Sequence, residues 1–262
     1  PEPPSRSNLT MSIAEPIGPA PSSAPALSPF TRMLRIFSRP SEAWVGLSER
    51  GQWWFPLLIM IVLEVALSAA TFRRVLLPDM FEKWEQQVAN GQMQASQLDS
   101  MQAFFTDSPA ALAWILGSIV IVIPLFMLLQ ALVLWFGAGF VLGARFRFSQ
   151  GITVVSWASL VNLPASFIRY GYGWARESFE GLHLGLGVLV PEPETHTKLY
   201  TGLTVFLDAI SPFAAWYLAV LVLGTAALAG APRRNVAWVL VTLYLAFVAF
   251  SAAVAAFFSS GT

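Results

Sequence analysis

The chain has 262 residues, of which 56% are hydrophobic, 13% aromatic and only 11% charged. A soluble domain usually carries about 25% charged residues, so the composition predicts lipid as the solvent around much of this chain. Its 15 basic and 15 acidic residues cancel, which gives no support to nucleic-acid binding, and the absence of cysteine excludes disulfides, thiol nucleophiles and cysteine metal sites.

The first 29 residues have the composition of a disordered tail. They are rich in Pro, Ser and Ala and lack a periodic apolar pattern, so they cannot bury enough surface to offset chain entropy. Met11 is a candidate native start, and no apolar stretch follows a basic start as a signal peptide requires.

A basic amphipathic segment follows this tail. Its large apolar residues recur at i, i+3, i+4 and i+7 with arginines between them, a spacing that predicts a helix with one apolar face. Such a helix lies at the surface of an anionic leaflet; packing on a soluble domain is the alternative, but no soluble domain remains for it. The candidate membrane-surface residues are Phe30, Arg32, Met33, Leu34, Arg35, Phe37, Arg39 and Trp44.

Five apolar stretches are long enough to cross a bilayer, which takes roughly 20 residues. The predicted fold is therefore an all-α polytopic membrane helix bundle, with residues 30–258 as its membrane domain. The predicted spans are residues 55–77, 110–142, 151–170, 212–229 and 236–258.

Lys and Arg counts in the connections set the predicted orientation. The N-terminal segment and the short loops after spans two and four hold nine basic residues, whereas the two long loops on the other side hold six basic and ten acidic ones. We therefore expect a cytoplasmic N-terminus and an external C-terminus, although Arg73 and Arg74 at the outer end of span one disagree. Residues 79–106 predict an outer amphipathic helical hairpin, and residues 181–210 an outer interfacial or re-entrant loop.

Glu64 is an ionisable residue near the middle of span one. A carboxyl at that depth is costly and is a functional-site hypothesis by default. It could relay protons, bind a cation or pair with an arginine; alternatively it stays protonated and hydrogen-bonds a neighbouring helix.

Span three is the most polar of the five. Its small polar residues mostly recur every three positions, which gathers them on one drifting face that either packs against another helix or lines a polar cavity. The candidates are Ser156, Ser159, Asn162 and Ser166, with Thr153 preceding them.

No motif of a known catalytic site is present: there is no HExxH, GxSxG, Walker loop or Rossmann fingerprint. His183 and His196, with Glu192 and Glu194, are spaced unlike a compact metal-ligand set. We therefore expect neither an enzyme nor a metal or other cofactor. Arginines in the two short loops enforce topology or bind acidic lipid; they are Arg145, Arg147, Arg233 and Arg234.

Several stretches resemble the bacterial branch of the YIP family, the Ypt/Rab-interacting-protein-like five-span membrane proteins. They are the FSRP step at residues 37–40 before a Trp-rich start of span one, SWASLVNLPASF at 156–167, SPFAAWYLAVLVLG at 211–224 and APRRN at 231–235. The resemblance implies five spans in a bacterial inner membrane and supplies no catalytic residues. Eukaryotic relatives are linked to Rab GTPases, but their Gly-Pro-containing acidic and aromatic signature has no counterpart here.

Two functions fit these observations. One is a non-enzymatic scaffold or adaptor that contacts the lipid bilayer and other membrane proteins, with possible self-association. The other is a transporter, channel or lipid-moving protein with a polar path near Glu64 and span three. A path requires Glu64 to face the polar residues of span three, whereas a helix contact without a cavity favours the scaffold.

Overall fold

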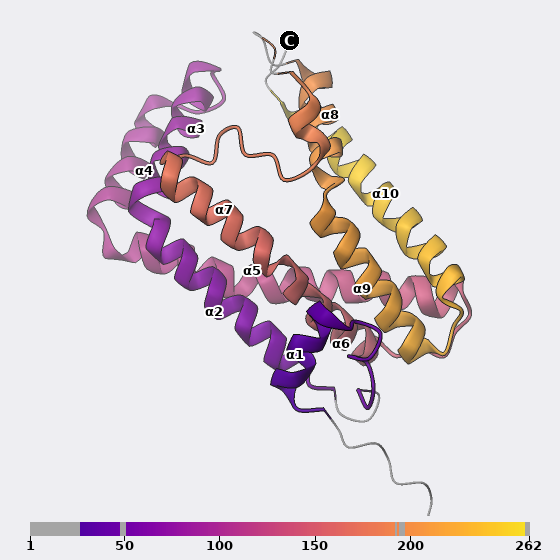
Figure 1. Ribbon diagram of the computed structural model, residues 1–262. Helices are drawn as coiled ribbons and strands as arrows, with labels where there is room; N and C mark the ends of the chain where they lie inside the picture. The colour runs from indigo at the N-terminus through magenta and orange to yellow at the C-terminus, as the bar shows by residue number, and fades with distance from the viewer. Residues whose placement is uncertain (1–26, 48–50, 192, 194–196, 260–262) are drawn as a thin grey trace, which may run out of the picture.

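The computed structural model describes residues 27–47, 51–191, 193 and 197–259. This part of the chain contains ten α-helices and no strand (Figure 1). The helices are α1 (Pro29–Ser38), α2 (Trp54–Thr71), α3 (Leu77–Ala89), α4 (Ala95–Asp107), α5 (Pro109–Trp135), α6 (Phe148–Ser159), α7 (Leu163–Arg176), α8 (Lys198–Ala209), α9 (Pro212–Ala229) and α10 (Arg233–Phe258). Two π-helical segments, η1 (Phe72–Leu76) and η2 (Phe136–Val141), and two 3₁₀ segments, η3 (Leu160–Asn162) and η4 (Leu186–Leu189), complete the list.

Five helices of this fold are long and apolar enough to cross a membrane, which confirms the predicted five-span class. They run over Trp54–Ala89, Pro109–Val141, Phe148–Arg176, Pro212–Ala229 and Arg233–Phe258. The first and third are longer than the sequence predicts. The first continues through η1 into α3, and η3 joins α6 to α7. Pro78 and Pro164 lie in the first turns of α3 and α7, directly after these irregular segments.

Helix ends follow local chemistry. The Ser211 side chain accepts a hydrogen bond from the Ala214 amide, and Pro212 follows it at the first turn of α9. Gly230 ends α9 in the left-handed region at φ 63°, which only glycine adopts at no steric cost. The chain can therefore turn sharply between α9 and α10.

The core lies around α6, which packs against α5, α9 and α2. Val154, Trp157, Ala158 and Leu160 are fully buried there. Many large apolar side chains face outward instead, such as Ile121 on α5, which is 68% exposed. An apolar exterior around a packed centre is what a helix bundle surrounded by lipid requires.

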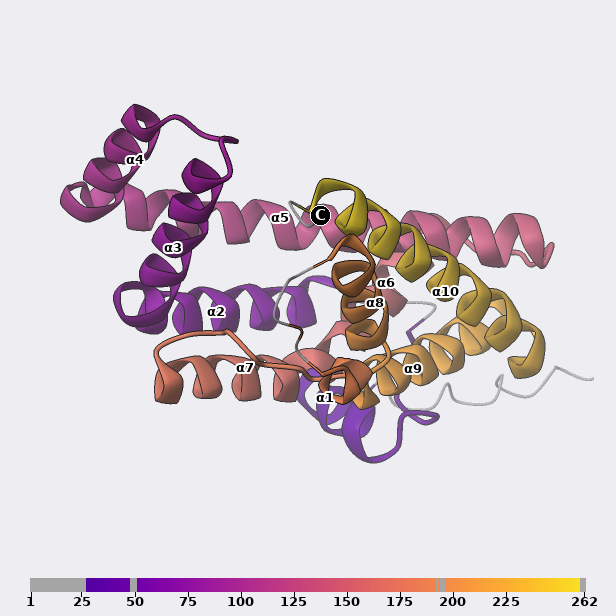
Figure 2. The same cartoon turned by 90° about the horizontal axis from the view of Figure 1, so that it is seen from above.

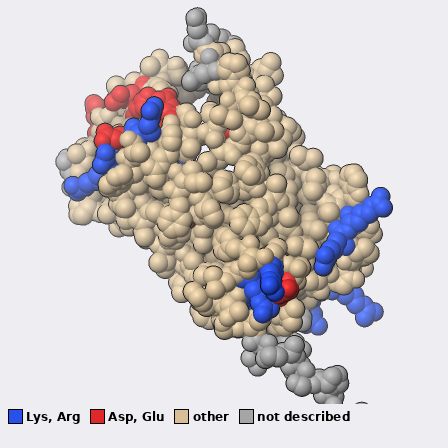
Figure 3. Space-filling model, in the orientation of Figure 1, with Lys and Arg blue, Asp and Glu red and all other residues tan. Residues whose placement is uncertain are grey.

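The two ends of the bundle differ in charge. In Figure 3, Asp and Glu gather at the upper left, where α3 and α4 lie, together with some basic side chains. Lys and Arg with little acid occupy the opposite end, where α1 and the α5–α6 and α9–α10 connections lie. We call this the basic end; its described arginines are Arg32, Arg35, Arg39, Arg145, Arg147, Arg233 and Arg234.

Helix α1 packs against α6 and η3, beside α9, as two perpendicular views agree (Figures 1 and 2). The sequence left no soluble domain for this helix to pack on, but the spans themselves provide the surface. Residues 29–47, which we call the N-terminal platform, are thus part of the bundle.

Candidate functional site: a polar ladder and an anchored platform

Glu64 meets the third span at a helix contact. Ser166 on α7 donates a hydrogen bond to Glu64 on α2. One turn further along each helix, the hydroxyls of Ser68 and Tyr170 are 2.8 Å apart. Because α2 and α7 run in the same direction, a step of four residues on both helices repeats the pairing. We call these four residues the α2–α7 ladder.

The other polar residues predicted on span three do not join this ladder. Ser156 donates to the backbone carbonyl of Trp53, and Ser159 donates to the carbonyl of Ser156 at 2.8 Å. Asn162 lies partly buried in η3. The predicted polar face therefore divides: Ser166 meets Glu64, whereas Ser156 and Ser159 donate to backbone carbonyls, as residues of packed helices in lipid commonly do.

Ser68 and Tyr170 escaped the sequence reasoning, although a signal for them exists. Ser68 lies four residues after Glu64, and Tyr170 four after Ser166, which is the spacing that places side chains on the same helix face. Applying the repeat to both spans at once finds the pair.

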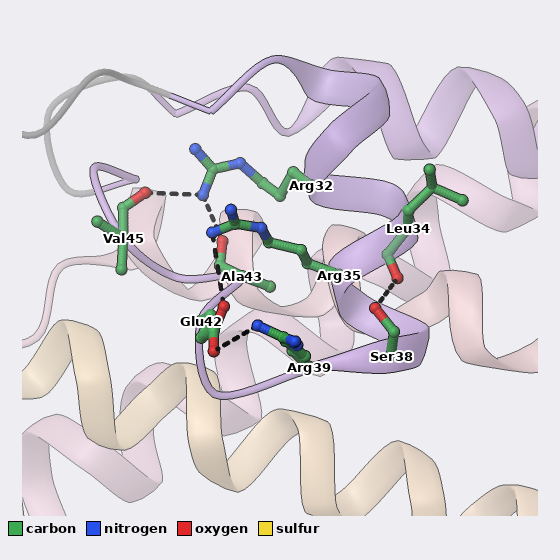
Figure 4. Close-up of polar contacts among 8 residues, drawn as sticks. All are labelled: Arg32, Leu34, Arg35, Ser38, Arg39, Glu42, Ala43 and Val45. Carbon is green, nitrogen blue, oxygen red and sulfur yellow. Dashed lines mark hydrogen bonds and ion pairs between the residues drawn. The ribbon is translucent and has the colours of Figure 1, made fainter.

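Arg32 holds the N-terminal platform together. Its guanidinium donates to the carbonyl of Ala43 and, over 3.0 Å, to that of Val45 (Figure 4). It also lies 5.7 Å from the ring centroid of Trp157 on α6. One cation thus ties α1 to the chain that follows it and stacks on the core helix.

The prediction that Arg32 lies at the membrane surface is therefore wrong. Its side chain is only 1% exposed. It lies on the same face as Ile36, four residues later and also buried, so the inward stripe of α1 is offset from the predicted apolar one. The periodicity of apolar residues misses this stripe because it treats every arginine as a surface residue.

Arg32 forms no ion pair with any carboxylate in the part of the chain that the structure describes. Glu42 instead lies 3.8 Å from Arg35 and 3.6 Å from Arg39 (Figure 4). Burial first, and then repulsion from Arg35, lower the pKa of Arg32 from its ordinary value to about 10. The group stays protonated at neutral pH, so the platform contains a buried positive charge that carbonyl dipoles and an aromatic face stabilise.

Aromatic contacts fix the platform to α9. Trp44, predicted at the membrane surface, is instead buried against Gly224, where an added Cβ would come within 2.7 Å of the indole ring. Phe37 and Trp216 make an edge-to-face contact with ring centroids 5.5 Å apart. These contacts bury one side of the platform against three elements of the bundle.

The remaining apolar residues of α1 face in two directions. Met33 and Phe37 pack partly against the core, whereas Phe30 and Leu34 are 61% and 53% exposed. The exposed pair lies on the same helix as Arg35, and Arg39 follows directly as the C-cap residue of that helix. The platform therefore presents an outward surface that combines apolar and basic side chains.

In the outer loop at residues 181–210, the side chains of His183 and Asp208 form a polar contact. The His183 ring nitrogen Nδ1 lies 2.8 Å from Asp208 Oδ2, and Gly185 and Gly187 lie so close to Asp208 that a Cβ at either would clash. His196, Glu192 and Glu194 lie outside the described residues, and no group of three possible metal ligands occurs among the residues that the structure does describe.

These features define an all-helical, five-span integral membrane protein with no recognisable catalytic centre in its described part. The chain belongs to the Yip1 family: the model of the Yip1 domain matches residues 34–255, from α1 to the last turn of α10. The resemblance to the YIP family is thereby confirmed at the level of the family. No curated protein and no solved structure shows significant similarity to the chain.

Proposed function

We propose that the chain is a non-enzymatic membrane scaffold of the adaptor type, with the N-terminal platform as its binding surface. The observation that supports this proposal is the anchoring of the platform by Arg32. A segment fixed at one end of the bundle keeps Phe30 and Leu34 exposed beside Arg35 and Arg39 without paying ordering entropy on binding. Other membrane proteins with apolar and acidic segments at the same membrane surface are its partners.

The basic end faces the cytoplasm of a bacterial cell in this proposal. Its arginines lie in short connections, where the positive-inside rule applies most strongly. The outer surface then carries the acidic α3–α4 hairpin. The protein resides in the inner membrane.

A transporter, channel or lipid-moving protein is the alternative. The α2–α7 ladder is the observation in its favour, since it places a carboxyl and three hydroxyls in the membrane. The ladder is a direct helix contact, however, and the hydroxyls of Ser156 and Ser159 already donate hydrogen bonds to backbone carbonyls. The scaffold therefore accounts for more of these residues than a polar path does.

Photocrosslinking in living cells tests the scaffold. A photoreactive phenylalanine derivative is placed at position 30 or 34, and at position 258 as a control that is also exposed but lies at the far end of α10. We expect discrete protein adducts from positions 30 and 34 only. Arg32→Met should abolish these adducts while the chain remains in the membrane. Adducts with lipid alone from both platform positions would show that the platform is not an adaptor surface.

A further inference from the structure

An apolar groove lies between α5 on one side and α9 and α10 on the other. Its volume is about 270 Å³, and Val155 of α6 contributes to its lining. Among the residues of its walls are Phe126, Leu129 and Val133 of α5 and Leu243 and Phe247 of α10. All four helices belong to membrane spans, so the groove is surrounded by hydrocarbon.

One end of the groove is closed and its side is open. Near the basic end, Gly137 of η2 packs against α10, where a Cβ would come within 3.0 Å of Leu243. Along the open side, Leu129 and Val133 remain about half exposed. At 1.5 Å per residue, the groove residues Leu240 to Phe247 of α10 lie about 10 to 21 Å from Arg233 along the helix. That depth is reached by acyl chains and not by headgroups.

The walls favour an acyl chain over a partner helix. Helices that pack in membranes present small residues that let backbones approach, whereas this groove is edged by Phe, Leu and Val. A narrow slot with bulky edges fits a flexible chain. Hydroxyls in the lining have partners within the protein: Tyr217 donates to Gln130 Oε1 over 2.8 Å, which joins α9 to α5, and Tyr244 donates to the carbonyl of Ala209.

Unpaired arginines lie at the ends of the helices that form the walls. Arg145 and Arg147 follow η2, and Arg233 and Arg234 begin α10. All four are exposed, and none forms an ion pair within the part of the chain that the structure describes. Guanidinium groups at that level suit the phosphate of a lipid headgroup.

We propose that the groove between α5 and α10 binds one acyl chain of an anionic phospholipid, whose phosphate contacts the arginines of the basic end. The site is separate from the N-terminal platform and does not depend on the scaffold function. It makes the bundle selective for lipid charge on its basic side.

The test uses the full chain in nanodiscs that contain a phosphatidylglycerol with a diazirine midway along one acyl chain. After illumination, adducts are mapped to peptides, and a phosphatidylcholine with the same chain serves as the comparison. We expect adducts concentrated on the groove residues of α5 and α10, several-fold more with phosphatidylglycerol. Leu129→Trp narrows the groove and should lower these adducts to the level of other lipid-facing surfaces. Leu125→Trp, one turn away on α5 and outside the groove, should leave them unchanged.

Further variants separate the chain from the headgroup. Arg233→Gln combined with Arg234→Gln should remove the preference for phosphatidylglycerol, whereas Arg176→Gln at the other end should not. If Leu129→Trp does not fold, Val133→Trp replaces it. The adduct map of the unaltered protein tests the proposal without any variant. Adducts spread evenly over all lipid-facing helices would overturn the proposal. So would equal labelling by both lipids.

Discussion

The hydroxyl of Ser166 donates a hydrogen bond to the carboxyl of Glu64, and this bond joins α7 to α2 inside the membrane. The contact turns an apparently isolated carboxyl into one member of the α2–α7 ladder. Because the Glu64 carboxyl is hydrogen-bonded at a direct contact between two helices, a structural role fits it better than a role in a conduction path.

We therefore predict that Glu64→Gln keeps both fold and function. The amide oxygen can still accept from Ser166, so the thermal midpoint in nanodiscs should stay close to that of the unaltered protein. Glu64→Ala leaves the Ser166 hydroxyl without its acceptor and should cost about 1–3 kcal/mol of unfolding free energy. Proteoliposome assays for protons, common cations and labelled lipid should show no difference between the unaltered chain and Glu64→Gln. A flux that disappears in the folded Gln variant would establish the transporter alternative.

The sequence predicts the spans well because their cause is local. A sufficiently long apolar run crosses a bilayer as a helix, because a helix satisfies its own backbone hydrogen bonds. Glu64 and Ser166 were also identifiable, since polar groups in such runs are rare. Their contact was not, because it depends on the relative register and direction of two spans that are 102 residues apart.

Arg32 shows where the sequence pattern fails. An arginine beside apolar residues normally marks a membrane surface, and nothing local reveals that the carbonyls of Ala43 and Val45 converge on it. The groove is equally hidden, since four helices distant in sequence form it. Tertiary packing therefore decides the role of both features.

Replacement of Arg32 by Met should release the N-terminal platform. The Ala43 carbonyl loses its donor in a buried position, and the stacking on Trp157 is lost, so about 1–3 kcal/mol of local stability should disappear. Chymotrypsin, which cuts after residues such as Phe30 and Phe37, should then cleave the segment much faster. Arg39→Met is the matched control: this arginine is 71% exposed in a surface ion pair, so its loss should change cleavage little. Equal cleavage of both variants would contradict the anchoring role.

The buried cation also predicts a specific pH dependence. Burial lowers the pKa of Arg32 to about 10 in the folded state, below its value in the unfolded state, so Arg32 is protonated in both states below about pH 9. The difference in stability between the unaltered chain and Arg32→Met should therefore be constant from pH 6 to 9. Above pH 10 the unfolded state binds more protons than the folded one, so stability rises with pH, and the difference should shift in favour of the unaltered chain. Thermal unfolding across this range, with Arg39→Met as reference, measures it; a shift between pH 6 and 9 would contradict the assignment.

Membrane orientation can be measured directly because the chain lacks cysteine. Ser149→Cys lies at the start of α6 near the basic end, and Ser100→Cys lies in α4 at the other end. We expect a membrane-impermeant maleimide to label Ser100→Cys in intact cells and Ser149→Cys only after lysis. Thr262→Cys should behave like Ser100→Cys. The reverse pattern would place the platform outside the cell and remove its proposed partners.

Gly224→Ala tests the packing of the platform on α9 without touching any charge. The new methyl group would lie 2.7 Å from the Trp44 ring, which is 4% exposed and cannot move outward freely. Overpacking of this kind should cost about 1–3 kcal/mol and should also speed chymotrypsin cleavage of the platform. Gly117→Ala on α5 is the matched control, because nothing lies within 4 Å of its added Cβ, and a helical Gly→Ala change there should be neutral or stabilise by up to about 1 kcal/mol. If both variants unfold at the temperature of the unaltered protein and cleavage is unchanged, Trp44 does not hold the platform on α9.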